Sequence, residues 1–250
     1  MPRLKDATMQ TGTVRGLQAF KFSGTKIGEL GATEYTLVTI AVDTTGSVMG
    51  FDKELRDCLI TAVDSCKKSP RSMNLLVRVI FFNSALPNGI DEIHGFKPLG
   101  DIDPSSYPDI VPDGLTPLYD ACFSAVGATL AYGKQLMDQD FLANGIVIVI
   151  TDGGDNVSSA TTTMIKKEIE RGTKGEEIES LIAIAVGVNT KFCATELAKL
   201  ETEAGMKYID AGDATKSKLA KLAGFVSQSV SSQSQSLGTG GPSQNIAATI

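Results

Sequence analysis

Long apolar runs that alternate with segments of helical spacing constrain the fold of this chain more than any other feature. Four of these runs are unbroken and rich in β-branched residues: Tyr35–Val42, Leu75–Phe82, Gly145–Ile150 and Leu181–Val188. Each is short enough for a strand that is buried on both faces. The segments with helical spacing cover residues 51–68, 118–142, 161–171, 191–204 and 215–230. This alternation predicts an α/β fold: a doubly wound, mostly parallel Rossmann-like sheet with helices on both faces.

The rest of the chain is less regular and sets the expected domain boundaries. Short strands are expected near residues 93–96 and 206–209, and another over 17–22 with a turn at 23–26. Residues 1–33 are interpreted as an N-terminal extension packed on the domain, and residues 34–228 as the domain itself. Residues 229–250 are rich in Ser, Gln and Gly, so a flexible tail is expected.

Charge and composition exclude several classes of function. The formal net charge is -6 and the pI about 4.9, so the surface repels phosphate backbones, and no nucleic acid is expected as a partner. No run reaches the roughly 18 apolar residues that a membrane helix needs, so no membrane association is expected. The four cysteines form no C-x-x-C pair, and no apolar run follows the N-terminal positive charges. A cytoplasmic protein is therefore expected, or one of the host cytoplasm or virion if it is phage-encoded.

Two aspartates follow two strands that meet at the predicted switch point of the sheet. Asp43 ends the first strand of the domain, and Asp152 follows the strand at 145–150. If the weak strand at 93–96 is counted, the common order 3-2-1-4-5-6 places these two strands side by side. Ligands of open α/β sheets bind at that crevice, outside the carboxyl ends of the strands. The two carboxylates are therefore expected to lie close together.

Hydroxyl groups accompany these carboxylates. Thr45 and Ser47 follow Asp43, and Thr116 begins the long helix at 118–142. Carboxylate and hydroxyl oxygens are hard ligands, which suit Mg²⁺, Ca²⁺ or Mn²⁺. The pattern thus indicates a site for a divalent cation.

Each of these residues also has a purely structural explanation when taken alone. Asp43 and Thr116 are good helix N-caps, and Asp152 before two glycines suits a turn. Asp155 and Asn156, which follow that turn, either support the site residues or are simple loop residues, and the loop interpretation is preferred. A common position at one crevice favours the metal site over three separate structural roles.

The combined pattern resembles the metal-ion-dependent adhesion site of von Willebrand factor A domains. It reads Asp43-x-Thr45-x-Ser47, then Thr116, then Asp152-Gly153. The likeness covers about residues 35–228, and the wording of residues 114–121 is similar to intracellular bacterial and phage members of the tellurite-resistance type. Thr45 stands where the family usually has Ser, which keeps the hydroxyl but adds a methyl group.

The resemblance implies a role for each residue and a class of function. Thr45, Ser47 and Thr116 would give hydroxyl oxygens to the metal, and Asp43 and Asp152 would supply negative charge, partly through waters. One open position would take a carboxylate from a protein partner. Intracellular members of the family often work beside AAA+ ATPases or in multiprotein assemblies, so a metal-dependent protein-binding module is the leading expectation.

Two other functions are weighed against this one. A Mg²⁺-dependent phosphatase of the haloacid dehalogenase type needs a second aspartate two residues after the first, and Thr45 stands at that position. A threonine cannot replace the proton transfer of that acid, so no enzyme is expected. A purely structural virion or assembly scaffold is compatible with the sequence.

Overall fold

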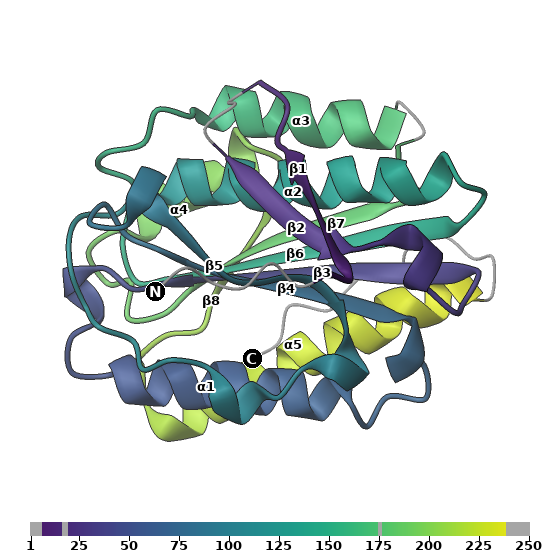
Figure 1. The fold of residues 1–250 in the computed structure, drawn as a ribbon. Helices are drawn as coiled ribbons and strands as arrows, with labels where there is room; N and C mark the ends of the chain where they lie inside the picture. The colour runs from purple at the N-terminus through teal and green to yellow at the C-terminus, as the bar shows by residue number, and fades with distance from the viewer. Residues whose placement is uncertain (1–6, 17–19, 175–176, 239–250) are drawn as a thin grey trace.

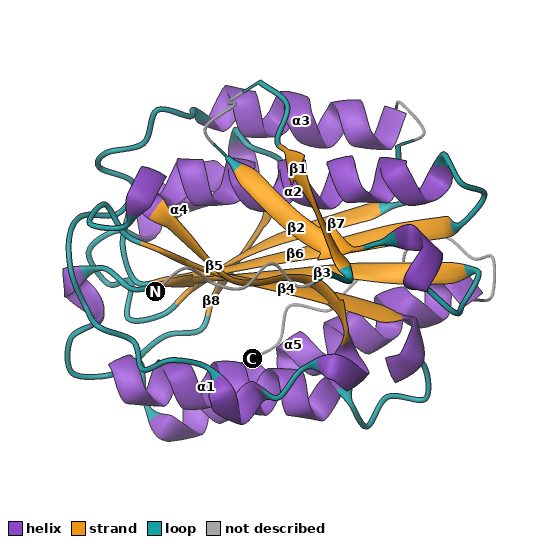
Figure 2. Ribbon diagram, viewed as in Figure 1, coloured by secondary structure: helices purple, strands orange, loops and turns teal. Residues whose placement is uncertain are grey.

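A mixed β-sheet between two layers of helices forms the fold. The computed structural model describes residues 7–16, 20–174 and 177–238. Helices α2, α3 and α4 cover one face of the sheet, and α1 and α5 cover the other (Figures 1 and 2). The predicted doubly wound α/β architecture is confirmed.

The sheet has eight strands in the order β1-β2-β5-β4-β3-β6-β7-β8. Their bounds are β1 Met9–Thr13, β2 Lys21–Thr25, β3 Glu34–Asp43, β4 Leu75–Phe82, β5 Ile90–Pro98, β6 Leu142–Thr151, β7 Leu181–Gly187 and β8 Lys207–Asp210. Strands β3, β4, β6, β7 and β8 are parallel to one another, whereas β5 runs antiparallel to β4. The six neighbouring strands β5-β4-β3-β6-β7-β8 therefore have the predicted 3-2-1-4-5-6 order.

The helices bury the two faces of this sheet. They are α1 Asp52–Cys66, α2 Leu118–Met137, α3 Thr162–Lys174, α4 Ala194–Thr202 and α5 Lys216–Gly238. Along β3, Leu37 and Ala41 belong to one hydrophobic cluster, and Val38 and Ile40 to the other, which explains why the strand is apolar on both faces. None of the helices in the described part of the chain combines the length and hydrophobicity that a bilayer crossing needs.

The N-terminal extension enlarges the sheet instead of only packing on it. Strands β1 and β2 form an antiparallel hairpin, and β2 lies parallel to β5 through the pair Gly24 and Phe96. The turn expected at 23–26 is wrong, because residues 23–25 belong to β2. A Cβ atom at Gly24 would lie 2.7 Å from the ring of Tyr132, so this glycine permits close packing rather than a turn. Residues 17–19 of the expected strand lie outside the described residues.

The expected flexible tail is wrong for residues 229–238, because α5 continues through them. Ser229, Val230 and Ser234 are buried in this part of the helix. Gln233 is buried as well, and its Nε2 donates to the carbonyl oxygen of Gly145 on β6 (3.3 Å). Small serine side chains let the helix approach the sheet closely, a packing role that a compositional rule for disorder does not consider. Residues 239–250 lie outside the described residues.

The packing of this last helical stretch generates a stability test. We expect Val230→Ala to lower the free energy of unfolding by about 1–3 kcal/mol, because the side chain is fully buried. The exposed Gln228→Ala, half a turn away, should change it by less than about 0.5 kcal/mol. Urea denaturation measures both variants. Equal, negligible effects would mean that the helix does not pack here.

Candidate functional site

Asp43 is the most deeply buried residue of the candidate site and lies where the neighbouring strands β3 and β6 end. It ends β3 and its side chain has no solvent exposure. Its Oδ1 accepts a hydrogen bond from the backbone N–H of Thr45 (2.9 Å), and its Oδ2 accepts one from the hydroxyl of Thr151 on β6 (2.6 Å). Burial raises the pKa of Asp43 to about 6. The carboxylate is thus held rigidly in a place where its charge is poorly solvated.

A chain of hydroxyl groups leads from the Asp43 loop to Asp152. The hydroxyl oxygens of Thr45 and Ser47 lie 2.9 Å apart, and the Ser47 hydroxyl donates to Oδ1 of Asp152 (2.7 Å). Burial raises the pKa of Asp152 above its ordinary value. The structure therefore brings together the four predicted site residues that follow β3 and β6.

Thr116 faces the same loop. A Cβ atom on Gly153 would lie 3.5 Å from the hydroxyl oxygen of Thr116 and 4.0 Å from that of Ser47. Thr116 is 4% exposed. All five predicted residues thus converge, and the lack of a side chain at Gly153 keeps a Cβ atom out of the space beside the hydroxyls of Thr116 and Ser47.

Backbone hydrogen bonds fix the Thr116 segment against the Asp43 loop. Asp113 N–H donates to the carbonyl oxygen of Thr44 (3.1 Å), and Gly46 N–H donates to that of Gly114 (3.2 Å). Gly114 has a φ of +70°, a left-handed conformation that favours glycine. The loops that follow β3 and precede α2 are therefore joined as one unit.

Asp155 and Asn156 have the supporting role that the sequence analysis considered but did not prefer. The side-chain oxygen of Asn156 accepts from Thr116 N–H (2.8 Å), and Asn156 N–H donates back to the Thr116 carbonyl (3.1 Å). Asp155 accepts from the N–H of Tyr119 in the first turn of α2 (3.1 Å). These contacts join segments some 40 residues apart, so no local pattern in the sequence marks them.

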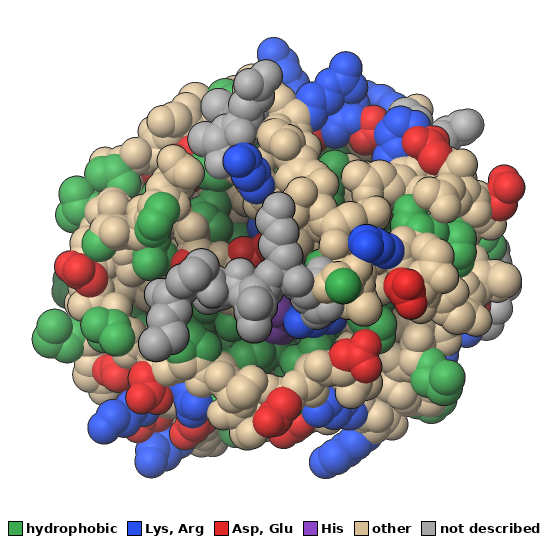
Figure 3. Space-filling view, in the orientation of Figure 1, with side chains coloured by type: hydrophobic (Ala, Val, Ile, Leu, Met, Phe, Trp, Pro, Cys, Tyr) green, Lys and Arg blue, Asp and Glu red, His purple; other side chains and the backbone are tan. Residues whose placement is uncertain are grey.

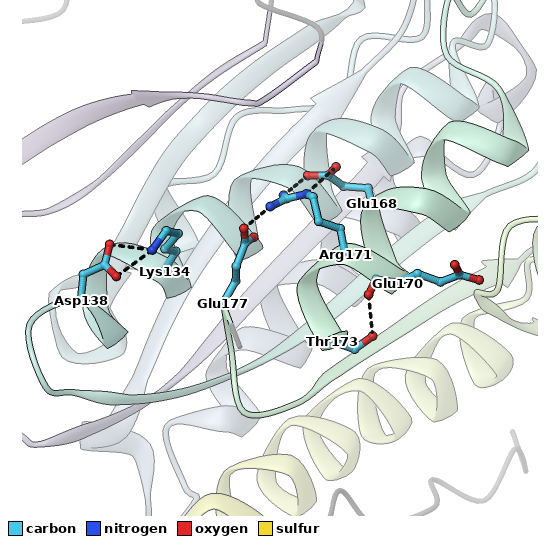
Figure 4. A network of polar contacts seen from close by, with 7 residues as sticks. All are labelled: Lys134, Asp138, Glu168, Glu170, Arg171, Thr173 and Glu177. Atoms are coloured by element: carbon cyan, nitrogen blue, oxygen red, sulfur yellow. Dashed lines mark hydrogen bonds and ion pairs between the residues drawn. The ribbon is translucent and has the colours of Figure 1, made fainter. Parts of the chain in front are cut away.

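The oxygen atoms of the site fit a hard divalent cation. Asp43 receives its hydrogen bonds from neutral groups, and neither Asp43 nor Asp152 has an ion pair with Lys or Arg in the described part of the chain. Carboxylates elsewhere have such partners, for example Glu168 and Glu177 with Arg171 (Figure 4). A buried carboxylate without a cation is costly, and a bound metal ion would supply the missing positive charge.

The donor set would consist of two carboxylates and three hydroxyls. No group of three or more His, Cys, Asp or Glu side chains suited to a metal exists within the described residues. The thiol of Cys193, absent from the predicted site, lies 3.3 Å from the backbone oxygen of Asp152. Burial raises the pKa of this thiol, so it stays protonated and is a poor ligand. Oxygen therefore remains the ligand atom of the site.

Comparison with known proteins identifies the fold. No protein-family model and no curated protein matches the sequence. Among solved structures, the PilB minor pilin from Streptococcus sanguinis matches with a TM-score of 0.53 at 14% identity, over 84% of this chain and 64% of the pilin. The pilus adhesin SpaC from Lactobacillus rhamnosus GG matches with a TM-score of 0.55 at 11% identity, over 85% of this chain and 32% of SpaC.

A third match is proximal thread matrix protein 1 from the mussel byssus, with a TM-score of 0.53 at 17% identity over 80% of this chain and 47% of that protein. The chain thus spans less than two thirds of each of these proteins. Identities this low establish the fold alone. The chain has a von Willebrand factor A-like α/β fold, and these similarities do not support the narrower likeness to tellurite-resistance-type members.

The burial of Asp43 predicts a dependence of stability on pH. Its pKa in the folded state, about 6, lies above the ordinary 3.8, so folding favours the protonated form. The resulting stability is present below about pH 4 and is lost as the pH rises to about 6. In EDTA, wild type should therefore lose roughly 3 kcal/mol relative to Asp43→Asn over this range.

Urea denaturation at several pH values measures this difference in unfolding free energy. Saturating Mg²⁺ is the control, since a bound cation favours the carboxylate and should remove the loss. A constant difference between wild type and Asp43→Asn in EDTA would show that Asp43 does not titrate in this range.

Proposed function

We propose that this protein is a divalent-metal-dependent binding module that recognises an acidic side chain of a partner protein. The metal would be Mg²⁺, or Mn²⁺ or Ca²⁺ in its place, held by Asp43, Thr45, Ser47, Thr116 and Asp152. The observation that carries the proposal is the buried Asp43 carboxylate, which has no Lys or Arg partner among the described residues and lies beside a connected set of hydroxyl oxygens. A bound cation would balance that charge and keep a coordination position for a carboxylate.

The hydroxyl ligands keep such a metal electrophilic. Neutral oxygens of Thr45, Ser47 and Thr116 donate less charge than carboxylates do, so an anionic ligand from outside is attracted to the ion. Thr45 is 1% exposed and its hydroxyl is hydrogen-bonded to Ser47, which supports its alignment with the site despite the added methyl group.

The surface around the site suits a protein partner rather than a small free carboxylate. Large hydrophobic side chains are exposed at seven described positions, and five of them lie in loops at the carboxyl edge of the sheet: Met49, Val111, Leu115, Val157 and Phe192. These five residues are called the apolar rim below, and three of them lie within two residues of Ser47, Thr116 or Asn156 in the sequence: Met49, Leu115 and Val157. In Figure 3, hydrophobic side chains appear along the left edge, where these loops lie in Figure 1. Clustered apolar groups at a surface typically mark a protein interface.

A binding role is favoured over catalysis by the position two residues after Asp43. Thr45 stands there, and its aliphatic hydroxyl is far too weak an acid to replace a carboxylic acid in protonating a leaving group. The three matched proteins are a minor pilin, a pilus adhesin and a thread matrix protein. We propose by analogy that the partner is a component of a protein assembly. The sequence resemblance to intracellular family members adds two further proposals: an AAA+ ATPase as the partner, and a cytoplasmic location.

Metal binding should be visible in thermal stability. A ligand that binds only the folded state adds about 2.7 kcal/mol at one hundred times its dissociation constant, which corresponds to a rise of a few degrees in Tm. We expect Mg²⁺ to produce this rise, relative to EDTA, in wild type and in Thr45→Ser, because both keep the hydroxyl. Asp152→Ala and Thr116→Ala should fold but show no rise.

Differential scanning calorimetry measures these shifts. Asp138→Ala, which removes an exposed carboxylate at the far end of α2, serves as the charge-matched control and should respond like wild type. A full Mg²⁺ response in Asp152→Ala would refute the assignment of the site.

A further inference from the structure

A hollow of about 320 Å³ lies next to the candidate metal site. Its lining residues are Phe20, Ser84, Asn88, Gly89, Pro117, Asp120, Val157 and Ser159. Pro117 directly follows Thr116, and Val157 directly follows Asn156, the residue that holds Thr116. The wall of the hollow is thus continuous with the segments that build the site.

Among the described residues that line the hollow, Asp120 of α2 is the one charged group. This side chain is only 8% exposed. Its carboxylate accepts hydrogen bonds from the backbone N–H groups of Ser159 (3.1 Å) and Ala160 (2.8 Å). It forms no ion pair with Lys or Arg among the residues that the structure describes, and the other described lining residues are neutral. A negative charge that is largely desolvated and lacks a cation is suited to a positive group from outside.

The neutral lining adds a second element of recognition. Phe20, Pro117 and Val157 give the hollow an apolar wall, whereas Ser84 and Asn88 are polar. Lysine and arginine side chains have an apolar stem that ends in a cation. The apolar wall of the hollow therefore suits their stems, and the Asp120 carboxylate suits their charge. A free metal ion or a small amine would use the carboxylate and leave the apolar wall uncovered.

We infer that the module binds two side chains of opposite charge on one segment of its partner. The acidic residue of the segment binds at the metal, and a lysine or arginine within a few residues of it enters the hollow and contacts Asp120. Neighbouring residues of an extended chain lie about 3.8 Å apart, which matches a hollow that begins one residue from Thr116. This inference rests on the proposed function, and it specifies the class of partner.

The first experiment selects ligands without assuming their sequence. Random linear peptides displayed on phage are bound to the full chain in saturating Mg²⁺ and eluted with EDTA. We expect the eluted peptides to share an Asp or Glu with a Lys or Arg within a few positions. Replacing that basic residue with Met in a synthetic copy should weaken binding to the wild-type protein by about tenfold, as loss of a partly buried charge pair does.

The second experiment locates the contact with a double-mutant cycle. Asp120→Asn keeps an acceptor oxygen for the N–H groups of Ser159 and Ala160 but removes the charge. We expect this variant to bind the basic peptide and its Met copy equally well. Asp138→Asn is the control, because it removes the same charge from the opposite end of α2 and should retain the tenfold preference.

The outcomes separate this inference from the proposed function. Peptides that carry an acidic residue without a basic neighbour, or an Asp120→Asn variant that still prefers the basic peptide, would overturn the role of the hollow and leave metal-dependent binding intact. Failure to recover any peptide by EDTA elution would contradict both. If Asp120→Asn does not fold, the comparison of the two peptides on wild type alone decides the basic preference.

Discussion

The parallel pairing of β3 with β6 brings together the segments that carry four of the five candidate ligands, Asp43, Thr45, Ser47 and Asp152. The two strands are in register from Glu34 and Leu142 to Val42 and Ile150, so both end at the same height at the centre of the sheet. Asp43 follows directly, and the Thr151 hydroxyl on the neighbouring strand bonds to its carboxylate. A slip of one residue would turn each side chain to the other face of the sheet and separate these groups. The hydrophobic alternation that fixes the register of the core thus also fixes the geometry of the site.

The same arrangement creates an electrostatic problem that a cation would resolve. Asp43 is fully buried, Asp152 is partly buried, and the pKa of each is raised by burial. The described hydrogen-bond partners of the two carboxylates are hydroxyls and a backbone N–H, which compensate a negative charge less well than a cation does. The apolar rim then adds surface that favours contact with a protein chain. Binding of metal and of partner would consequently be coupled. The metal would balance the charge of the site carboxylates, and the partner's carboxylate would fill the open coordination position of the metal.

The core of the fold was predictable because its strands are buried on both faces and leave unbroken apolar runs. The order of β5, β4, β3, β6, β7 and β8 followed from those runs, and with it the meeting of Asp43 and Asp152. The second half of β2 was mispredicted as a turn, because Gly24 permits close contact with Tyr132, which no turn rule describes. The end of α5 was missed because Ser and Gln are typical of disordered segments, whereas here they are buried against the sheet.

The support of Thr116 shows a second limit of sequence reasoning. The candidate ligands carry a spacing that can be recognised, but Asn156 acts through contacts between distant segments. The hollow beside Pro117 likewise combines residues from distant segments that no linear pattern connects: Phe20 before β2, Ser84 after β4 and Asp120 in α2. Ligand types could therefore be predicted, while their positioning residues required the three-dimensional structure.

Direct titration with Mn²⁺, followed by the electron paramagnetic resonance signal of the free ion, tests the central claim most directly. The account predicts one bound Mn²⁺ per chain, displaced by Mg²⁺ and lost in a variant that combines Asp43→Asn with Asp152→Ala. Absence of binding in the wild type, or binding that persists in the double variant, would contradict it.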